Sequence, residues 1–102
     1  MNFSQLMKQA QQMQNRVNKQ KKILDEREYP FESQEKLIYG VMKGPLELTD
    51  LHIYSSLLGN ENKDDLEALL VATLNQAMKN VTKEREDTLN KLTNGVDVSS
   101  IL

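Results

Sequence analysis

The sequence predicts an α+β domain with the element order α-β-β-β-α, in which a three-stranded antiparallel meander is flanked by two long helices. Two observations lead to this prediction. Apolar residues recur on a helical period near the start and near the end of the chain. Between these two regions, residues 29–54 form short apolar segments that are separated by turn residues, which is typical of strands joined by short loops.

The first helix is expected to span about Ser4 to Arg27. Its apolar residues follow a seven-residue spacing in two neighbouring columns: Phe3, Ala10, Val17 and Leu24 in one, and Leu6 and Met13 in the other. Tyr29-Pro30 should end this helix, because proline disfavours the α conformation at the residue before it.

Three strands are predicted after this helix, at about residues 29–32, 37–42 and 46–53. The first contains Pro30, which cannot donate a ladder hydrogen bond, so this strand should lie at a sheet edge. Lys43-Gly44-Pro45 provides a turn between the second and third strands. Within the third, the apolar spacing changes from even to odd near Thr49-Asp50, which indicates a β-bulge.

The last helix is expected from about Lys63 to Thr93, after an N-cap at Asn62 and before the stop signal Asn94-Gly95. The chain length fits one domain, which we place at residues 1–95. Residues 96–102 are expected to form a flexible tail.

The lengths of these elements predict a homodimer. The two helices would be roughly 33 and 45 Å long, whereas a strand of six or seven residues covers about 20 Å. The helices must therefore extend beyond the sheet as arms, and their apolar residues need to be covered either by each other or by a second subunit. An apolar belt at the start of the last helix is the predicted dimer interface: Leu66, Leu69, Leu70 and Leu74.

Charge is distributed unevenly along the chain. Residues 1–24 contain only basic charges, whereas residues 25–102 hold all fifteen acids and give the chain its net charge of −2. On a helix, the basic residues of the first segment fall on one arc opposite the apolar residues: Lys8, Arg16, Lys19 and Lys22. Lys79 and Lys83 in the last helix could extend this cationic surface.

A basic helical face has three interpretations: a solvated surface, a contact surface for phosphates, or a helix that lies on a membrane. The membrane interpretation is the weakest, because glutamine and asparagine dilute the polar side and the chain has no Trp. No apolar run is long enough to span a bilayer, and residues 1–24 lack the apolar core of a signal peptide, so we expect a cytoplasmic protein.

Catalysis is poorly supported by the sequence. His52 is the only histidine, there is no Cys, and the acids near the last helix are explained by capping and ion pairing. The glycines are isolated and form no phosphate-binding loop. We therefore expect neither an enzyme nor a cofactor, metal or small-molecule substrate.

Three segments together carry a resemblance to a known family. Residues 6–14, Leu-Met-Lys-Gln-Ala-Gln-Gln-Met-Gln, resemble the N-terminal helix of the YbaB/EbfC family of bacterial nucleoid-associated proteins. Residues 51–58 resemble the family's last strand and the turn after it, and residues 66–77 resemble the start of its C-terminal helix. The resemblance covers roughly residues 3–93 with the segments in the right order.

This resemblance implies a tweezer-shaped homodimer that binds double-stranded DNA in the bacterial nucleoid, needs no cofactor, and influences nucleoid organisation or gene expression. We expect Arg16, Lys19 and Lys22 to contact phosphates, with Lys8 next and with Lys79 and Lys83 as helpers. The alternative is a protein-interaction module whose dimer arms clamp a partner helix or peptide. Salt dependence separates the two, because only phosphate contacts release counterions.

Overall fold

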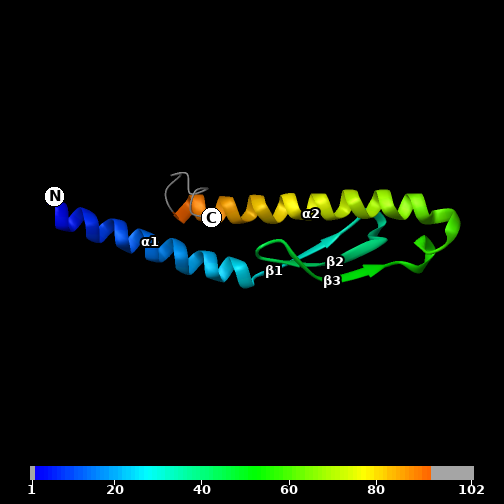
Figure 1. The fold of residues 1–102 in the computed structure, drawn as a ribbon, viewed down its shortest axis with the longest axis horizontal. Coiled ribbons are helices and arrows are strands. Elements are labelled where there is room, and N and C mark those ends of the chain that lie inside the picture. Colours follow the sequence, from blue (N-terminus) through cyan, green and yellow to red (C-terminus); the bar gives the residue numbers. More distant parts are fainter. Residues whose placement is uncertain (1, 93–102) are drawn as a thin grey trace.

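The computed structural model describes residues 2–92 and confirms the order α-β-β-β-α (Figure 1). Its elements are α1 (Phe3–Glu26), β1 (Glu28–Glu32), β2 (Ile38–Lys43), β3 (Glu47–Ile53) and α2 (Lys63–Leu92). The expected stop at Asn94-Gly95, the domain boundary at residue 95 and the tail 96–102 lie outside the described residues. The molecule is elongated, with principal extents of 70 × 19 × 18 Å.

Helix α1 begins and ends close to the predicted positions, for identifiable local reasons. The Asn2 side-chain oxygen accepts a hydrogen bond from the Gln5 backbone N–H at 2.8 Å, so the helix starts one residue earlier than expected. At the other end, Arg27 is extended. Pro30 disfavours the α conformation at Tyr29, so the helix has to end before that residue. The extended Arg27 agrees with this restriction.

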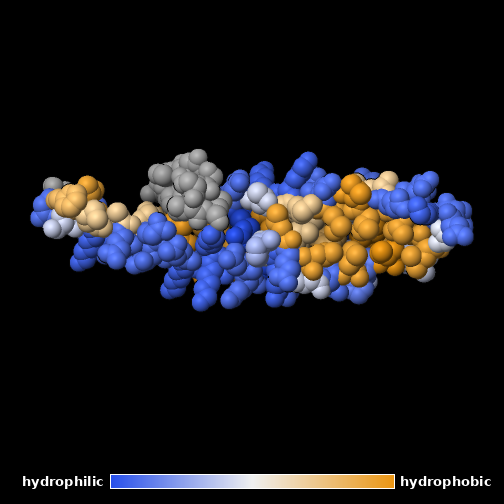
Figure 2. Space-filling view, viewed as in Figure 1, coloured by the Kyte–Doolittle hydropathy of each residue, from blue (hydrophilic) through white to orange (hydrophobic). Residues whose placement is uncertain are grey.

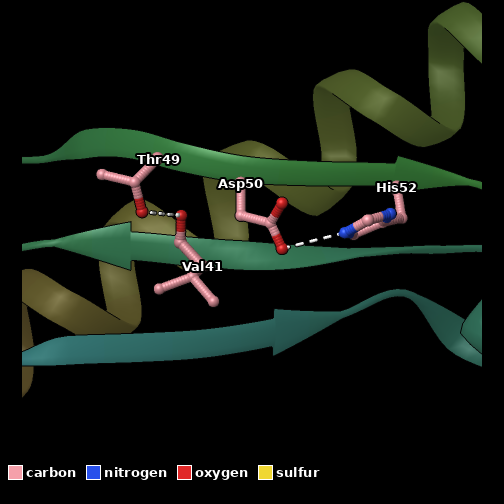
Figure 3. Close-up of polar contacts among 4 residues, drawn as sticks. All are labelled: Val41, Thr49, Asp50 and His52. Carbon is pink, nitrogen blue, oxygen red and sulfur yellow. Dashed lines mark hydrogen bonds and ion pairs between the residues drawn. The ribbon is translucent and has the colours of Figure 1, made fainter.

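The sheet has the order β1-β2-β3, and both pairings are antiparallel. The predicted bulge is confirmed: Val41 pairs with Asp50 and Met42 with Leu48, which leaves Thr49 without a partner. The Thr49 hydroxyl donates to the Val41 carbonyl at 3.2 Å and so satisfies an acceptor beside the irregular ladder (Figure 3).

Helix α2 has two packing partners along its length. As far as Val81 it covers the inner face of the sheet, where Ala77 and Val81 pack against Tyr29 and Met42. Its C-terminal part packs against α1, where Leu89 is buried with two residues of that helix: Val17 and Leu24. The part of α2 that extends beyond the sheet is therefore covered by α1 of the same chain.

The end of α1 is fixed to α2 and to the β2–β3 turn. Arg85 is 12% exposed and donates to the Asp25 carboxylate at 2.7 Å. Gly44 lies against the same part of α1, and a Cβ at this position would overlap the Asp25 backbone. Burial raises the pKa of the Tyr29 hydroxyl, which lies near the Arg85 guanidinium.

The connector before α2 differs in detail from the sequence prediction. Asn62 was expected to cap α2, and α2 does begin at Lys63. Asn62 itself belongs to a short 3-10 turn, and its side-chain amide donates to the Ser56 carbonyl at 2.8 Å. This side chain therefore ties the connector to the start of the helix.

Candidate nucleic-acid interface

The basic residues of α1 lie on the side of the helix that is turned away from α2. Val17 and Leu24 pack towards α2. With about 100° of rotation per residue, four cations fall within an arc of about 120° opposite Val17. These cations are all exposed: Lys8, Arg16, Lys19 and Lys22. We call this surface the α1 basic face.

The surface between these cations carries amides and no carboxylate. Its exposed members include Gln5, Gln9, Gln12 and Asn15. The first acid of the chain is Asp25, and the exposed Glu26 closes the face at the end of α1. Amide groups both donate and accept hydrogen bonds. The α1 basic face therefore offers charges for phosphates and polar groups for bases or sugars, with no anion before its last turn.

The charges of this face are not neutralised by ion pairs within residues 2–92. The ion pairs of that region join other groups: Arg27 with Glu84, Lys63 with Glu67, Arg85 with Asp25, and His52 with Asp50. The cations of the α1 basic face can therefore approach an anionic partner without first breaking an internal ion pair.

Lys79 and Lys83 are also exposed, but one chain does not bring them to the α1 basic face. Helical rotation places both on the side of α2 that faces away from the sheet and from α1. Exposed acids follow closely in the chain at Glu84, Glu86 and Asp87. Within one chain these two lysines form a separate surface of mixed charge. They could bind the same DNA as the α1 basic face only if a second subunit brings the two surfaces together or if the DNA contacts both sides of the molecule.

The four leucines of the predicted dimer interface are half-buried in one chain: Leu66, Leu69, Leu70 and Leu74. Large apolar side chains beside them are more exposed, with Val71 at 61% and Leu58 at 60%. Figure 2 shows apolar residues gathered over the sheet and the adjoining part of α2. This end of the molecule therefore presents more apolar surface than the sequence prediction included.

Strand β3 contributes to this apolar surface. Leu51 pairs with Gly40 and Leu48 pairs with Met42, so both leucines lie on the inner face of the sheet. They are nevertheless 37% and 41% exposed, because α2 packs mainly over β1 and β2. The alternation of Leu48, Leu51 and Ile53 indicated an apolar strand face, but it did not show that α2 would leave this face partly uncovered.

On its other flank, α2 borders a groove beside β1 with a volume of about 1030 Å³. Leu69, Ala72 and Gln76 line it from α2, and Glu28 and Glu32 line it from β1. The predicted dimer residues therefore do not form one stripe, because Leu69 lies towards this groove and helical rotation places Leu70 and Leu74 towards β3.

A small polar cluster occupies the outer face of the sheet (Figure 3). His52 Nε2 lies 2.9 Å from Asp50 Oδ2, and the His52 ring stacks on Tyr39 with the ring centroids 4.8 Å apart. The side chains of His52 and Asp50 are each about half exposed. A hydrogen-bonded, stacked histidine on an open strand has the surroundings of a structural surface residue rather than those of a general base in a cleft.

We expect a His52→Ala protein to keep its fold and its DNA affinity, with both changing by less than about 0.5 kcal/mol, because exposed ion pairs contribute little. Thermal unfolding and a DNA titration check this. A loss of DNA affinity greater than tenfold would instead assign the outer sheet face to the interface.

Within residues 2–92, no group of three or more His, Cys, Asp or Glu side chains is placed to hold a metal ion. Across the same part of the chain, no helix combines the length and apolar character needed to cross a membrane.

A family model described as the YbaB/EbfC DNA-binding family matches residues 1–96. A nucleoid-associated protein of Enterococcus faecalis is 33% identical over 95 residues, which cover 93% of this chain and 91% of the relative. A nucleoid-associated protein of Hahella chejuensis is 36% identical over 97 residues, which cover 95% and 89%.

A solved structure is also similar. It is the crystal structure of the uncharacterized protein HP0035 from Helicobacter pylori, with a TM-score of 0.76 and 26% sequence identity. The similarity covers 91% of this chain and 98% of that one. The fold described above therefore also occurs in a structure determined by experiment.

Proposed function

The chain belongs to the YbaB/EbfC DNA-binding family, and we propose that it binds double-stranded DNA as a homodimer through the α1 basic face. Residues 1–95 would form the single DNA-binding domain. The activity would require no cofactor and no chemical step. Binding would place the protein in the nucleoid of the bacterial cytoplasm, where it would influence nucleoid organisation or gene expression.

The observation that carries this proposal is the absence of acids from the first 24 residues, combined with exposed cations that lack ion-pair partners in residues 2–92. Residues 25–102 have a net charge of −7, so the chain as a whole would be repelled by DNA. A local positive face overcomes this repulsion because salt screens charges more than about 10 Å away. Arg16, Lys19 and Lys22 are the proposed phosphate contacts, and Lys8 supports them nearer the N-terminus.

The dimer is supported by the apolar surface at the sheet end of the molecule. Single exposed apolar residues are ordinary, but a contiguous apolar patch on a soluble protein usually marks an interface. The proposed interface comprises the predicted Leu66, Leu70 and Leu74 together with the more exposed Val71, Leu48 and Leu51, and the predicted Leu69 lies at its edge beside the groove. A two-fold axis through this surface would present the α1 basic face twice.

The alternative function is a module that clamps a partner helix or peptide, and the groove between β1 and α2 is the observation that favours it. The groove borders both elements, and it has apolar and amide side chains in its wall. Its Glu28, Glu32 and Glu84 would suit a basic segment rather than DNA.

A salt titration tests the proposal. The wild-type protein should bind random and genomic duplexes alike. If the dimer neutralises about 4 to 6 phosphates, log K should fall against log salt with a slope of about −4 to −5. Apolar clamping predicts affinity that changes little with salt. Failure to bind duplex DNA at about 50 mM salt would reject the proposal and favour the clamp.

A further inference from the structure

The N-terminal part of α1 projects beyond the other helix and the strands (Figure 1). Among residues 2–92, Met13 is the apolar residue nearest to the N-terminus that packs against the α1–α2 core. About ten helical residues precede it, which corresponds to roughly 15 Å of helix. The apolar side of α1 nevertheless continues to the end, where Phe3 is 74% exposed and Leu6 and Met7 are each 55% exposed. Figure 2 shows this apolar colouring at the far end of the arm.

The charges around this arm tip restrict what can cover it. Lys8 is the nearest cation, Gln5 and Gln9 are exposed beside it, and no acid precedes Asp25. A basic protein surface would be repelled by this tip. Contact between two arm tips would also bring like charges together. The suitable partner is negatively charged outside and apolar inside, which describes stacked base pairs between two phosphate backbones.

We propose that Phe3, supported by Leu6 and Met7, inserts between base pairs as an apolar wedge and bends the bound duplex. This inference rests on the proposed DNA-binding function. Phe3 is the first residue of α1, and helical side chains lean towards the N-terminus, so its ring leads the arm. A helix about 10 Å wide cannot enter a minor groove of about 6 Å, but side chains at its tip can.

Lys8 lies in a position to assist this insertion. It follows Phe3 by five residues, or roughly 7.5 Å along the helix, on the side opposite the apolar residues. Lys8 would therefore hold a phosphate while the ring enters the stack. In a two-fold dimer the two arms would insert two wedges into one duplex, and wedges of this kind kink DNA by about 20 to 90° each.

The test is a bending measurement on a short duplex with a fluorescent donor and acceptor at its ends, using the full chain. The wild-type protein should raise energy transfer. Phe3→Ala should abolish most of that rise and weaken binding by about tenfold, because base–aromatic stacking is lost. Its salt slope should stay at the wild-type value, since no phosphate contact is removed. Tyr39→Ala, which truncates a 46% exposed aromatic side chain on the outer face of the sheet, is the matched control and should bend DNA normally.

Three outcomes would overturn the wedge. If Phe3→Ala retains both the bend and the affinity while the wild type binds in a salt-dependent way, the wedge is wrong and the DNA-binding function stands. If Phe3→Ala loses the dimer in sedimentation, the arm tip is covered by the second copy instead. If the wild-type protein binds no duplex at all, the wedge and the proposed function fail together.

Discussion

Replacing both Arg16 and Lys19 with alanine is expected to weaken DNA binding by at least about 100-fold at roughly 0.1 M salt. A dimer loses four cations of the α1 basic face, and each lost phosphate contact removes about 0.9 from the slope of log K against log salt. A wild-type slope of about −4 to −5 should therefore flatten to about −1. The loss should be the same for every duplex sequence, because phosphate contacts do not read bases.

The matched control is the double substitution Lys79→Ala and Lys83→Ala. It changes the net charge by the same amount but removes exposed lysines from the opposite side of one chain. If DNA contacts the α1 basic face, this control should lower the DNA affinity clearly less than the Arg16 and Lys19 substitutions do. Circular dichroism and dimer mass should not change in either variant, since exposed helical cations contribute little to stability. Unchanged affinity and slope in the Arg16 and Lys19 variant would mean that the basic face is only solvated, and would favour the clamp.

The element order and most boundaries could be predicted because local chemistry sets them. Pro30 limits α1 and marks β1 as an edge strand, and the change of spacing near Thr49 marks the bulge. These signals act within a few residues, so a single sequence contains them in full.

The arrangement of the elements could not be predicted in the same way. An apolar period identifies which side of a helix is buried, but not what buries it. The apolar residues of α2 beyond the sheet were expected to need a covering surface, and α1 of the same chain provides it around Leu89. The pair between Asp25 and Arg85 joins residues that are sixty positions apart, and no local pattern reports such a contact.

In the candidate site, too, the features of a single helix could be predicted, whereas those that depend on the packing of two elements could not. The α1 basic face belongs to one helix, so its arc follows from the helical period alone. Lys79 and Lys83 were grouped with it from their charge, but relating two helices requires their packing, and the packing places these lysines on the opposite side. The apolar contribution of Leu48 and Leu51 was missed for the same reason, because the position of α2 over the sheet is a tertiary property.

The second large effect is expected from Val71→Asp, which places a charge in the apolar surface at the sheet end of the molecule and should weaken the dimer. Val71 is 61% exposed in one chain, and Val and Asp have similar helix propensities, so a single chain should fold normally. In the proposed dimer the same side chain is buried. Burial of a valine contributes about 1.5 to 3 kcal/mol, and an unpaired carboxylate in its place adds a further desolvation cost at both copies. Because about 1.4 kcal/mol corresponds to a tenfold change, the dissociation constant should rise at least about 100-fold.

Sedimentation at low micromolar concentration checks this result, with Thr82→Asp as the matched control. Thr82 is exposed on a similar side of α2, about 16 Å further along the helix and beyond the proposed interface. The control should remain dimeric, whereas Val71→Asp should sediment as a folded monomer. That monomer keeps its own α1 basic face, so its DNA binding should persist with about half the wild-type salt slope. A Val71→Asp protein that remains a dimer would exclude this surface from the interface, and a wild type that is itself a folded monomer would reject the tweezer arrangement.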